Sequence, residues 1–295
     1  QHLTDSGTPV DFVGPYDDVY DNVADRPGAH TYNDPAFDRD HAARWGLTFA
    51  FPTDQIGDLV ATYHPDVVVE MGGINDLTFL QRTPESVAGS VRDFVADARA
   101  ADPEVDVVLV HQLQTWFDGV GVAAFNDLLD DLAAEVDEVG SRVVVAPADA
   151  GFPRTEDTWD TSHPNARGEL KVAASVAGAL AALGVAPPFP LPLEEPPLGP
   201  RFAPVLAATA RDGGVSLTWT GPPGATSERI WLRDATTGEA WRMLPDPVPE
   251  PFTEDYGIED LVNGHTYAVR LQPVKGFLPA APDVRSNVVR VRPLP

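Results

Sequence analysis

Asp66-Val-Val-Val-Glu-Met-Gly-Gly-Ile-Asn-Asp76 places a short β-branched run directly before two glycines and two small polar side chains. A run of this length and composition predicts a strand that is buried on both faces. Similar Val-rich runs follow at 105–110 and 142–146, and helical patterns lie between them at 83–101 and 122–139. Buried strands that alternate with helices predict a parallel sheet covered by helices on both faces, which is an α/β fold.

Three further elements complete this part of the chain. We expect a short apolar strand over Val10–Val13, a helix over Thr53–Tyr63 and a last helix over His163–Leu183. Thr83 followed by Pro84 is a start signal for the helix that runs to about residue 101.

A proline-rich stretch from Gly184 to Pro200 interrupts this pattern. Proline at this density fits neither a helix nor a central strand, and it favours an extended spacer. We therefore predict one domain over residues 1–184, a linker over 185–200 and a second domain over 201–295.

The second domain contains short runs with period-two alternation, such as 215–219, 229–233 and 266–271, separated by turn signals. This pattern predicts an all-β sandwich. The segment resembles a fibronectin type III domain. The residues that carry the resemblance are Trp219, the pair Leu261 and Tyr267 that matches a tyrosine corner, and Ser286-Asn287 before a last Val-rich strand.

Composition excludes several function classes. The formal net charge is −25 and the pI is about 4.4, which disfavours nucleic acid as a partner. The chain has no cysteine, so thiolate chemistry is absent, and no apolar run approaches the length of a membrane span. The acidic stretch 16–40 contains seven Asp residues, but their spacing matches no known Ca²⁺ loop. We expect no cofactor and no metal, and a solvated loop at 16–40.

Three short segments carry candidate chemistry. In Asp160-Thr-Ser-His163-Pro-Asn165 an Asp three residues before a His can orient the imidazole as a general base. Asn75, after the strand that ends at Met71, can donate its amide N–H to an oxyanion, and so can the N–H of Gly46. Each segment also has a plain reading, as a helix cap or an ordinary loop.

Together, in this order, the three segments resemble the SGNH (GDSL-type) hydrolase family. The resemblance covers residues 1 to about 184, and Val10–Pro15 is similar to a strand of its carbohydrate-esterase branches. It implies a flavodoxin-like three-layer fold, with His163 as base, Asp160 as its orienting partner, and Asn75 with Gly46 as the oxyanion hole. His41 and Arg44, beside Gly46, depart from the Gly- and His-rich stretch of the related esterases.

The family's nucleophilic serine is not evident. Ser6 is the nearest match, yet only three residues precede its Thr-Asp-Ser-Gly string, and too few separate it from Val10 for the expected helix. Residues 1–7 look like the end of that helix with Gly7 as its cap. We expect the first strand and nucleophile to lie upstream of Gln1, and little esterase activity for this chain by itself.

Two functions remain open at this stage. The first is a secreted or cell-surface bacterial serine esterase that acts on a small ester or an acetylated carbohydrate. The second is a non-catalytic binding or adhesion protein, in which a degenerate hydrolase domain and the fibronectin-like domain contact a polysaccharide or a protein partner. A Gly-Asp-Ser strand upstream of Gln1 favours the enzyme, and a signal peptide there favours the binding protein. Trp116 and Phe117 fit either a substrate-cleft wall or the core.

Overall fold

The computed structural model describes residues 1–295 except 22–25, 31, 33, 51–54, 118 and 250–255. It divides into two compact units. The first comprises Gln1–Thr155 and Gly168–Leu193, and the second comprises Glu156–Arg167 and Glu194–Pro295. The segment with Asp160 and His163 therefore groups with the β-rich half of the chain.

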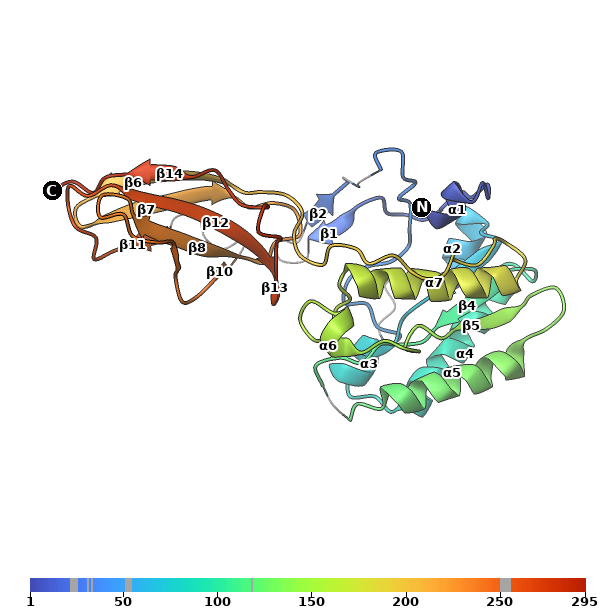
Figure 1. The fold of residues 1–295 in the computed structure, drawn as a ribbon. Coiled ribbons are helices and arrows are strands. Elements are labelled where there is room, and N and C mark those ends of the chain that lie inside the picture. Colours follow the sequence, from blue (N-terminus) through green and yellow to red (C-terminus); the bar gives the residue numbers. More distant parts are fainter. Residues whose placement is uncertain (22–25, 31, 33, 51–54, 118, 250–255) are drawn as a thin grey trace. The chain divides into compact units, whose positions relative to one another are not determined.

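The centre of the first unit is a parallel sheet in the order β3-β4-β5 (Figure 1). Its strands are β3 (Val67–Glu70), β4 (Asp106–Val110) and β5 (Val143–Ala146). Register pairs Glu70 with Leu109, which in turn pairs with Val145. The carboxyl ends of the three Val-rich strands therefore meet at one edge, as the sequence predicts for a parallel sheet.

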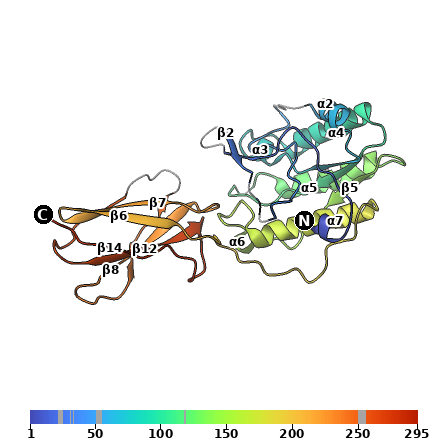
Figure 2. The ribbon, with the colours of Figure 1, turned by 90° about the horizontal axis from the view of Figure 1, so that it is seen from above.

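Helices cover both faces of this sheet (Figures 1 and 2). One face packs against α4 (Pro84–Ala101) and α5 (Val122–Val136), through a core that includes Val91, Phe125 and Leu129. The other packs against α7 (Ala166–Ala182), through Val108, Val110 and Leu180. The helix α2 (Ile56–Tyr63) packs against α4. The predicted three-layer arrangement is confirmed.

Local signals set the helix bounds. The Thr83 hydroxyl accepts the N–H of Ser86 at the start of α4, as the capping pattern predicts. The helix α5 ends at Val136, three residues before the predicted end, because the Asp137 carboxylate accepts the N–H of Val143 and holds the chain in a turn. The predicted start of the second helix at Thr53 and Asp54 lies outside the described residues.

The Val10–Val13 prediction is wrong. These residues form no strand, Val10 and Phe12 are partly exposed, and the N–H of Phe12 donates to the Asp38 carboxylate instead. An apolar run becomes a strand only when a neighbour accepts its ladder. Two short strands follow, β1 (Val19–Asp21) and β2 (Arg26–Ala29), which form a separate antiparallel ribbon. In the described residues β3 is an edge strand and its Val69 is 47% exposed, so the prediction that this run is buried on both faces is wrong.

The second unit contains two antiparallel sheets. One has the order β11-β7-β6, and the other has β10-β8-β12-β13, with β9 beside β8 and β14 beside β12. Their bounds are β6 Val205–Arg211, β7 Gly214–Thr220, β8 Ser227–Asp234, β9 Arg242–Met243, β10 Val248–Pro249, β11 Tyr256–Ile258, β12 Tyr267–Lys275, β13 Leu278–Pro279 and β14 Val289–Val291. Side chains from both sheets share one core, which includes Leu217, Ile230 and Leu271.

Two contacts in this unit involve the residues singled out in the sequence. The Tyr267 hydroxyl accepts the N–H of Val262, next to buried Leu261. The Asn287 side chain accepts from the N–H of Leu206 and donates to its carbonyl. Both tie the end of one strand to a neighbouring segment.

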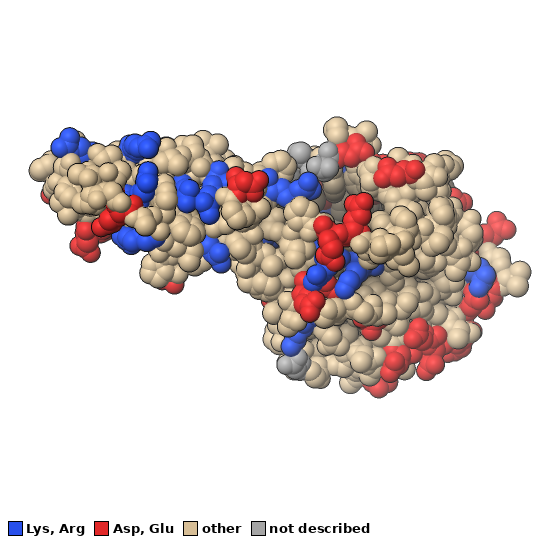
Figure 3. All heavy atoms as spheres, viewed as in Figure 1, with Lys and Arg blue, Asp and Glu red and all other residues tan. Residues whose placement is uncertain are grey.

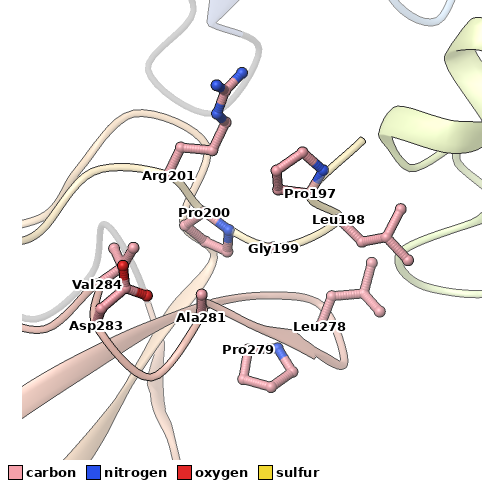
Figure 4. A pocket seen from close by; sticks show the side chains of 10 residues that line it. All are labelled: Pro197, Leu198, Gly199, Pro200, Arg201, Leu278, Pro279, Ala281, Asp283 and Val284. Atoms are coloured by element: carbon pink, nitrogen blue, oxygen red, sulfur yellow. The ribbon is translucent and has the colours of Figure 1, made fainter. Parts of the chain in front are cut away.

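The end of the proline-rich segment packs on the β13 region (Figure 4). Residues 197–201 line one side of a hollow of about 400 Å³, and the other side is lined by Leu278, Pro279, Ala281, Asp283 and Val284. No helix among the described residues combines the length and the hydropathy of a membrane span.

Charge is divided unequally along the chain. Residues 1–200 contain ten Lys and Arg against thirty-four Asp and Glu, whereas residues 201–295 contain ten against eleven. Figure 3 shows Lys and Arg side chains spread over one face of the β-rich part. The acidity of the protein thus belongs almost entirely to its first two hundred residues.

Candidate active site

The segment with Asp160 and His163 is a tight turn between α6 (Arg154–Asp157) and α7. Asn165 holds the two ends of this turn together. Its side-chain amide donates to the carbonyls of Glu156 and Thr158, and its backbone N–H donates to the Asp157 carbonyl. The side chain also caps α7 by accepting the N–H of Arg167. The helix therefore begins at Ala166, three residues later than the sequence predicts.

The Asp160 carboxylate orients both the backbone and the imidazole of His163. One oxygen accepts the N–H groups of Ser162 and His163 at 3.0 and 2.7 Å. The other lies 2.7 Å from His163 Nδ1. A neutral imidazole that donates from Nδ1 keeps its lone pair on Nε2, which is the state a general base requires. The His163 side chain is 38% exposed.

Trp159 stacks on one face of the same imidazole. The two rings are stacked at 5.3 Å between centroids, with 15° between their planes. The Trp159 carbonyl accepts the N–H of Phe277, and the Lys275 ammonium lies 5.6 Å from the Trp159 ring. Gly276 between them has φ +57°, and a Cβ there would collide with the Trp159 carbonyl oxygen. The turn from β12 to β13 thus needs a glycine at position 276 to approach Trp159 closely.

The predicted oxyanion residues lie in the first unit. Asn75 is in α3 (Ile74–Thr78), directly after β3 and the two glycines, and its Nδ2 donates to the carbonyl of Leu47 at 3.1 Å. Gly46 lies in the adjoining turn with φ +81°, a conformation that favours glycine. The structure therefore brings Asn75 and the Gly46–Leu47 turn together, and separately brings Asp160 and His163 together.

Asp76 is a residue whose role the sequence reasoning missed. It is fully buried, and its carboxylate accepts the N–H groups of Phe49 and Ala50 at 2.9 and 3.0 Å. Arg82 donates to it at 2.7 Å. These bonds hold the segment that follows Gly46 against α3. The signal was available, because Asp76 closes the Gly-x-Asn-Asp motif.

Glu70 was also missed. It ends β3 beside the Gly72 N–H, and desolvation raises the pKa of its carboxyl to about 7. A carboxyl group with such a pKa exchanges its proton near neutral pH. The one sequence signal for a role of Glu70 was its position at the end of a Val-rich strand, two residues before Gly72.

The Ser6 hydroxyl is hydrogen-bonded at the end of a short helix. Ser6 follows α1 (His2–Asp5), its hydroxyl donates to the carbonyl of Leu3 at 2.8 Å, and it is exposed. Gly7 has φ +75° and its N–H donates to Thr4, while Thr8 donates to Leu3. This pattern is a helix C-terminal cap, as the sequence predicts for residues 1–7.

Aromatic side chains form an exposed cluster in the first unit. Phe117 makes edge-to-face contacts with Trp116 and with Phe79, at 6.3 and 5.9 Å between ring centroids. Trp116 and Phe117 are each 44% exposed, and Phe79 is 63% exposed. The core alternative for Trp116 and Phe117 is therefore wrong. Phe79 directly follows α3, the helix that carries Asn75, and so links the aromatic cluster to that helix.

The acidic stretch 16–40 is organised around Asp18. Its carboxylate accepts the N–H of Gly28 and pairs with Arg44, and both interactions hold its pKa below the usual value. The Arg44 guanidinium also stacks on Tyr16 at 3.4 Å. No group of three metal-ligating side chains occurs in the described part of the chain. Asp25, one of the seven acids, lies outside that part.

The model of the GDSL-like lipase/acylhydrolase family matches residues 3–170. A carbohydrate esterase family 3 structure from Talaromyces cellulolyticus is similar, with TM-score 0.54 and 27% identity over 62% of this chain and 86% of that one. An acetyl esterase mutant with bound acetate ion gives TM-score 0.53 and 27% identity over 61% and 86%.

A Clostridium thermocellum family 3 carbohydrate esterase shares the fold, with TM-score 0.50 and 22% identity over 61% and 82% of the two chains. No curated protein matches this sequence. The family model covers more than half of the chain, and the fold of the first unit agrees with it. The chain belongs to the GDSL-like lipase/acylhydrolase family.

Proposed function

We propose that this protein is a serine esterase that removes acetyl or other small acyl groups from carbohydrate. The observation that carries the proposal is the Asp160–His163 pair, in which the carboxylate lies 2.7 Å from Nδ1 and orients the imidazole as a base. The similarity to carbohydrate esterases supports the substrate class.

In this proposal the base removes the proton from a serine hydroxyl, which attacks the ester carbonyl and forms an acyl-enzyme. Asn75 and the N–H of Gly46 donate to the oxyanion, and the imidazolium returns its proton to the leaving alcohol. Water then releases the acid by the reverse sequence of proton transfers. The exposed Phe79, Trp116 and Phe117 form an apolar wall for the bound ester.

We further propose that Ser6 is not the nucleophile, and that residues 1–295 by themselves hydrolyse esters poorly. The support is the capping role of the Ser6 hydroxyl. The open edge of β3, with Val69 exposed, also fits a sheet that accepts one more strand.

The test compares hydrolysis of p-nitrophenyl acetate and acetylated xylan by residues 1–295 and by the product of the complete reading frame. We expect the complete product to be active, and His163→Ala to lower its kcat by about 10³-fold or more. Ser6→Ala is the matched control and should leave the rate unchanged. Loss of turnover in Ser6→Ala would overturn the nucleophile proposal.

The second candidate is a non-catalytic protein that binds a polysaccharide through its β-rich part, which we propose to be a fibronectin type III domain. The observations that favour it are the Tyr267 corner and the cationic face of that part. An inactive complete product that still binds polysaccharide would favour this candidate over the esterase. Secretion or cell-surface display is proposed for either function.

A further inference from the structure

Arginine and tryptophan side chains alternate across the outer face of the sheet that contains β8 and β12. In order they are Arg233, Trp241, Arg270, Trp231 and Arg285, and we call them the Arg–Trp stack. The guanidinium carbons of Arg233 and Arg270 lie 5.0 and 4.2 Å from the Trp241 ring centroid. Those of Arg270 and Arg285 lie 5.8 and 5.3 Å from the Trp231 centroid.

Strand register places this stack on one face. Arg270 pairs with Trp231 across β12 and β8, and directly paired residues point to the same side of a sheet. The alternate residues Ile230 and Leu232 are buried in the core, so Trp231 points away from it. The same face continues to Arg290, because Ala268 pairs with Arg233 on one side and with Arg290 on the other.

Among the described residues, no carboxylate forms a salt bridge with Arg233, Arg270 or Arg285. The outward positions of β8 hold Ser227, Arg229, Trp231 and Arg233, and its two acids, Glu228 and Asp234, point inward. In the part of the chain that the structure describes, the buried Nε atoms of Arg233, Arg270 and Arg285 have no hydrogen-bond acceptor.

The stack has an electrostatic cost that an external anion relieves. Burial, and then the charges of Arg285 and Arg233, lower the pKa of Arg270 below its usual value. Cation–π contact offsets part of this cost and holds each guanidinium plane in one orientation. A row of ordered, repelling cations is therefore prepared to accept anions at little further entropic cost.

We propose that the Arg–Trp stack binds the carboxylate groups of an acidic polysaccharide. The polysaccharide class rests on the proposed carbohydrate esterase function, and the carboxylates rest on the stack itself. Guanidinium groups cover the two Trp rings, so these rings offer little free surface for stacking on a neutral sugar. The planar fork of each Arg matches a carboxylate in a bidentate pair.

The observations favour a polyuronate over nucleic acid. The same covered Trp rings leave no platform for stacked bases, on which single-strand binding depends. Double-stranded DNA carries one charge per about 1.7 Å, and the strongly acidic first two hundred residues repel so dense a charge. A polymer with about one carboxylate per sugar is repelled less.

The experiment is isothermal titration calorimetry of the full 295-residue chain with polygalacturonate, unsubstituted xylan and double-stranded DNA. We expect binding to polygalacturonate alone, with an affinity that falls as NaCl is raised. Arg270→Gln and Arg285→Gln should each weaken it about tenfold or more. Arg270→Lys keeps the charge without the planar fork, and should lie between the wild type and Arg270→Gln.

Arg211→Gln is the matched control. It removes the same charge from β6 in the other sheet, where Arg211 pairs with exposed Glu259, and should leave the affinity unchanged. Thermal melting of every variant shows that the fold is retained. Equal affinities for Arg270→Gln and Arg211→Gln, or binding to DNA or neutral xylan as tight as to polygalacturonate, would overturn the proposal.

The readout does not depend on turnover. Ester hydrolysis without polygalacturonate binding removes this inference and leaves the proposed function standing. Polygalacturonate binding that depends on the Arg–Trp stack, without ester hydrolysis, supports this inference and removes the proposed function.

Discussion

At the residue scale, the two oxygens of Asp160 have separate tasks. One holds the backbone of the turn, and the other faces His163 Nδ1. A substitution that still accepts the backbone N–H groups but donates to Nδ1 therefore separates the effect on folding from the effect on proton transfer.

Asp160→Asn makes that separation. Its amide oxygen can still accept the N–H groups of Ser162 and His163, but its NH₂ faces Nδ1 and forces the proton onto Nε2. We expect little change in melting temperature and the opposite imidazole tautomer, read from ¹⁵N NMR shifts of His163. In an active complete product kcat should fall by about 10²–10⁴-fold.

Asp160→Ala is the comparison variant. It removes both tasks, so the free energy of unfolding should fall by about 1–2 kcal/mol as well. An unaltered tautomer in Asp160→Asn would contradict the orienting role of this carboxylate.

Glu70 gives a second prediction at this scale. Its folded pKa of about 7 lies above the ordinary value of 4.5 for a Glu carboxyl, so the native state retains a proton that the unfolded chain releases. Stability should therefore fall as pH rises from about 4.5 through 7, by on the order of 1–3 kcal/mol. Urea unfolding at pH 5 and pH 8 measures this change.

Glu70→Gln cannot titrate, and it should flatten that dependence over the same pH range. A wild type that gains stability between pH 5 and pH 8 relative to Glu70→Gln would show that burial of this carboxyl is not the dominant effect.

At the scale of elements, the sequence predicted the strands and helices whose signals are local. The Val-rich runs became β3, β4 and β5, and Thr83 capped α4, because burial pattern and capping depend on neighbours in sequence. Val10–Val13 failed because a strand also needs a partner, which no local pattern supplies.

In the candidate site too, contacts between residues close in sequence were predictable, and contacts between residues far apart in sequence were not. Asp160 and His163 could be paired from the sequence, since only Thr161 and Ser162 separate them in a tight turn. The Gly-x-Asn-Asp motif pointed to Asp76 but not to its partners Phe49 and Ala50, which are remote in sequence. No pattern pointed to Trp159, whose partner Phe277 is more than a hundred residues away.

The contact of the β12–β13 turn with Trp159 gives the element-scale prediction. Gly276→Ala should displace Trp159, since its Cβ collides with the Trp159 carbonyl, and so alter the ring-current shift of the His163 imidazole protons. Gly238→Ala is the matched control, because Gly238 also has positive φ and no atom lies within 4 Å of a Cβ there.

Both glycine variants should lose about 1 kcal/mol of stability from the left-handed conformation. Only Gly276→Ala should move the His163 signals. The same shift in both variants would show that the turn does not act through Trp159.

At the scale of the whole molecule, the uneven charge has a measurable effect. The excess of acids in residues 1–200 opposes compaction by self-repulsion, and salt screens that repulsion. Raising NaCl from about 0.05 to 0.5 M, where the Debye length falls several-fold, should slow amide exchange in β4 by about threefold or more.

Exchange in β12 should change less, because residues 201–295 are nearly balanced in charge. Hydrogen–deuterium exchange mass spectrometry reads both strands in one experiment. An equal response of β4 and β12 would mean that self-repulsion does not limit the stability of the acidic part.

The grouping of residues 156–167 with 194–295 bears on how this protein can be rearranged during evolution. The composition suggests a clean exchange point in the proline-rich stretch, but Trp159 keeps its contacts with Phe277 and Lys275 on the far side of it. A gene fusion that replaced everything after residue 200 would have to supply a new support for Trp159. Residues 1–200 and 201–295 are therefore expected to be inherited together. Substitutions at Trp159 and at Gly276 are expected to occur together.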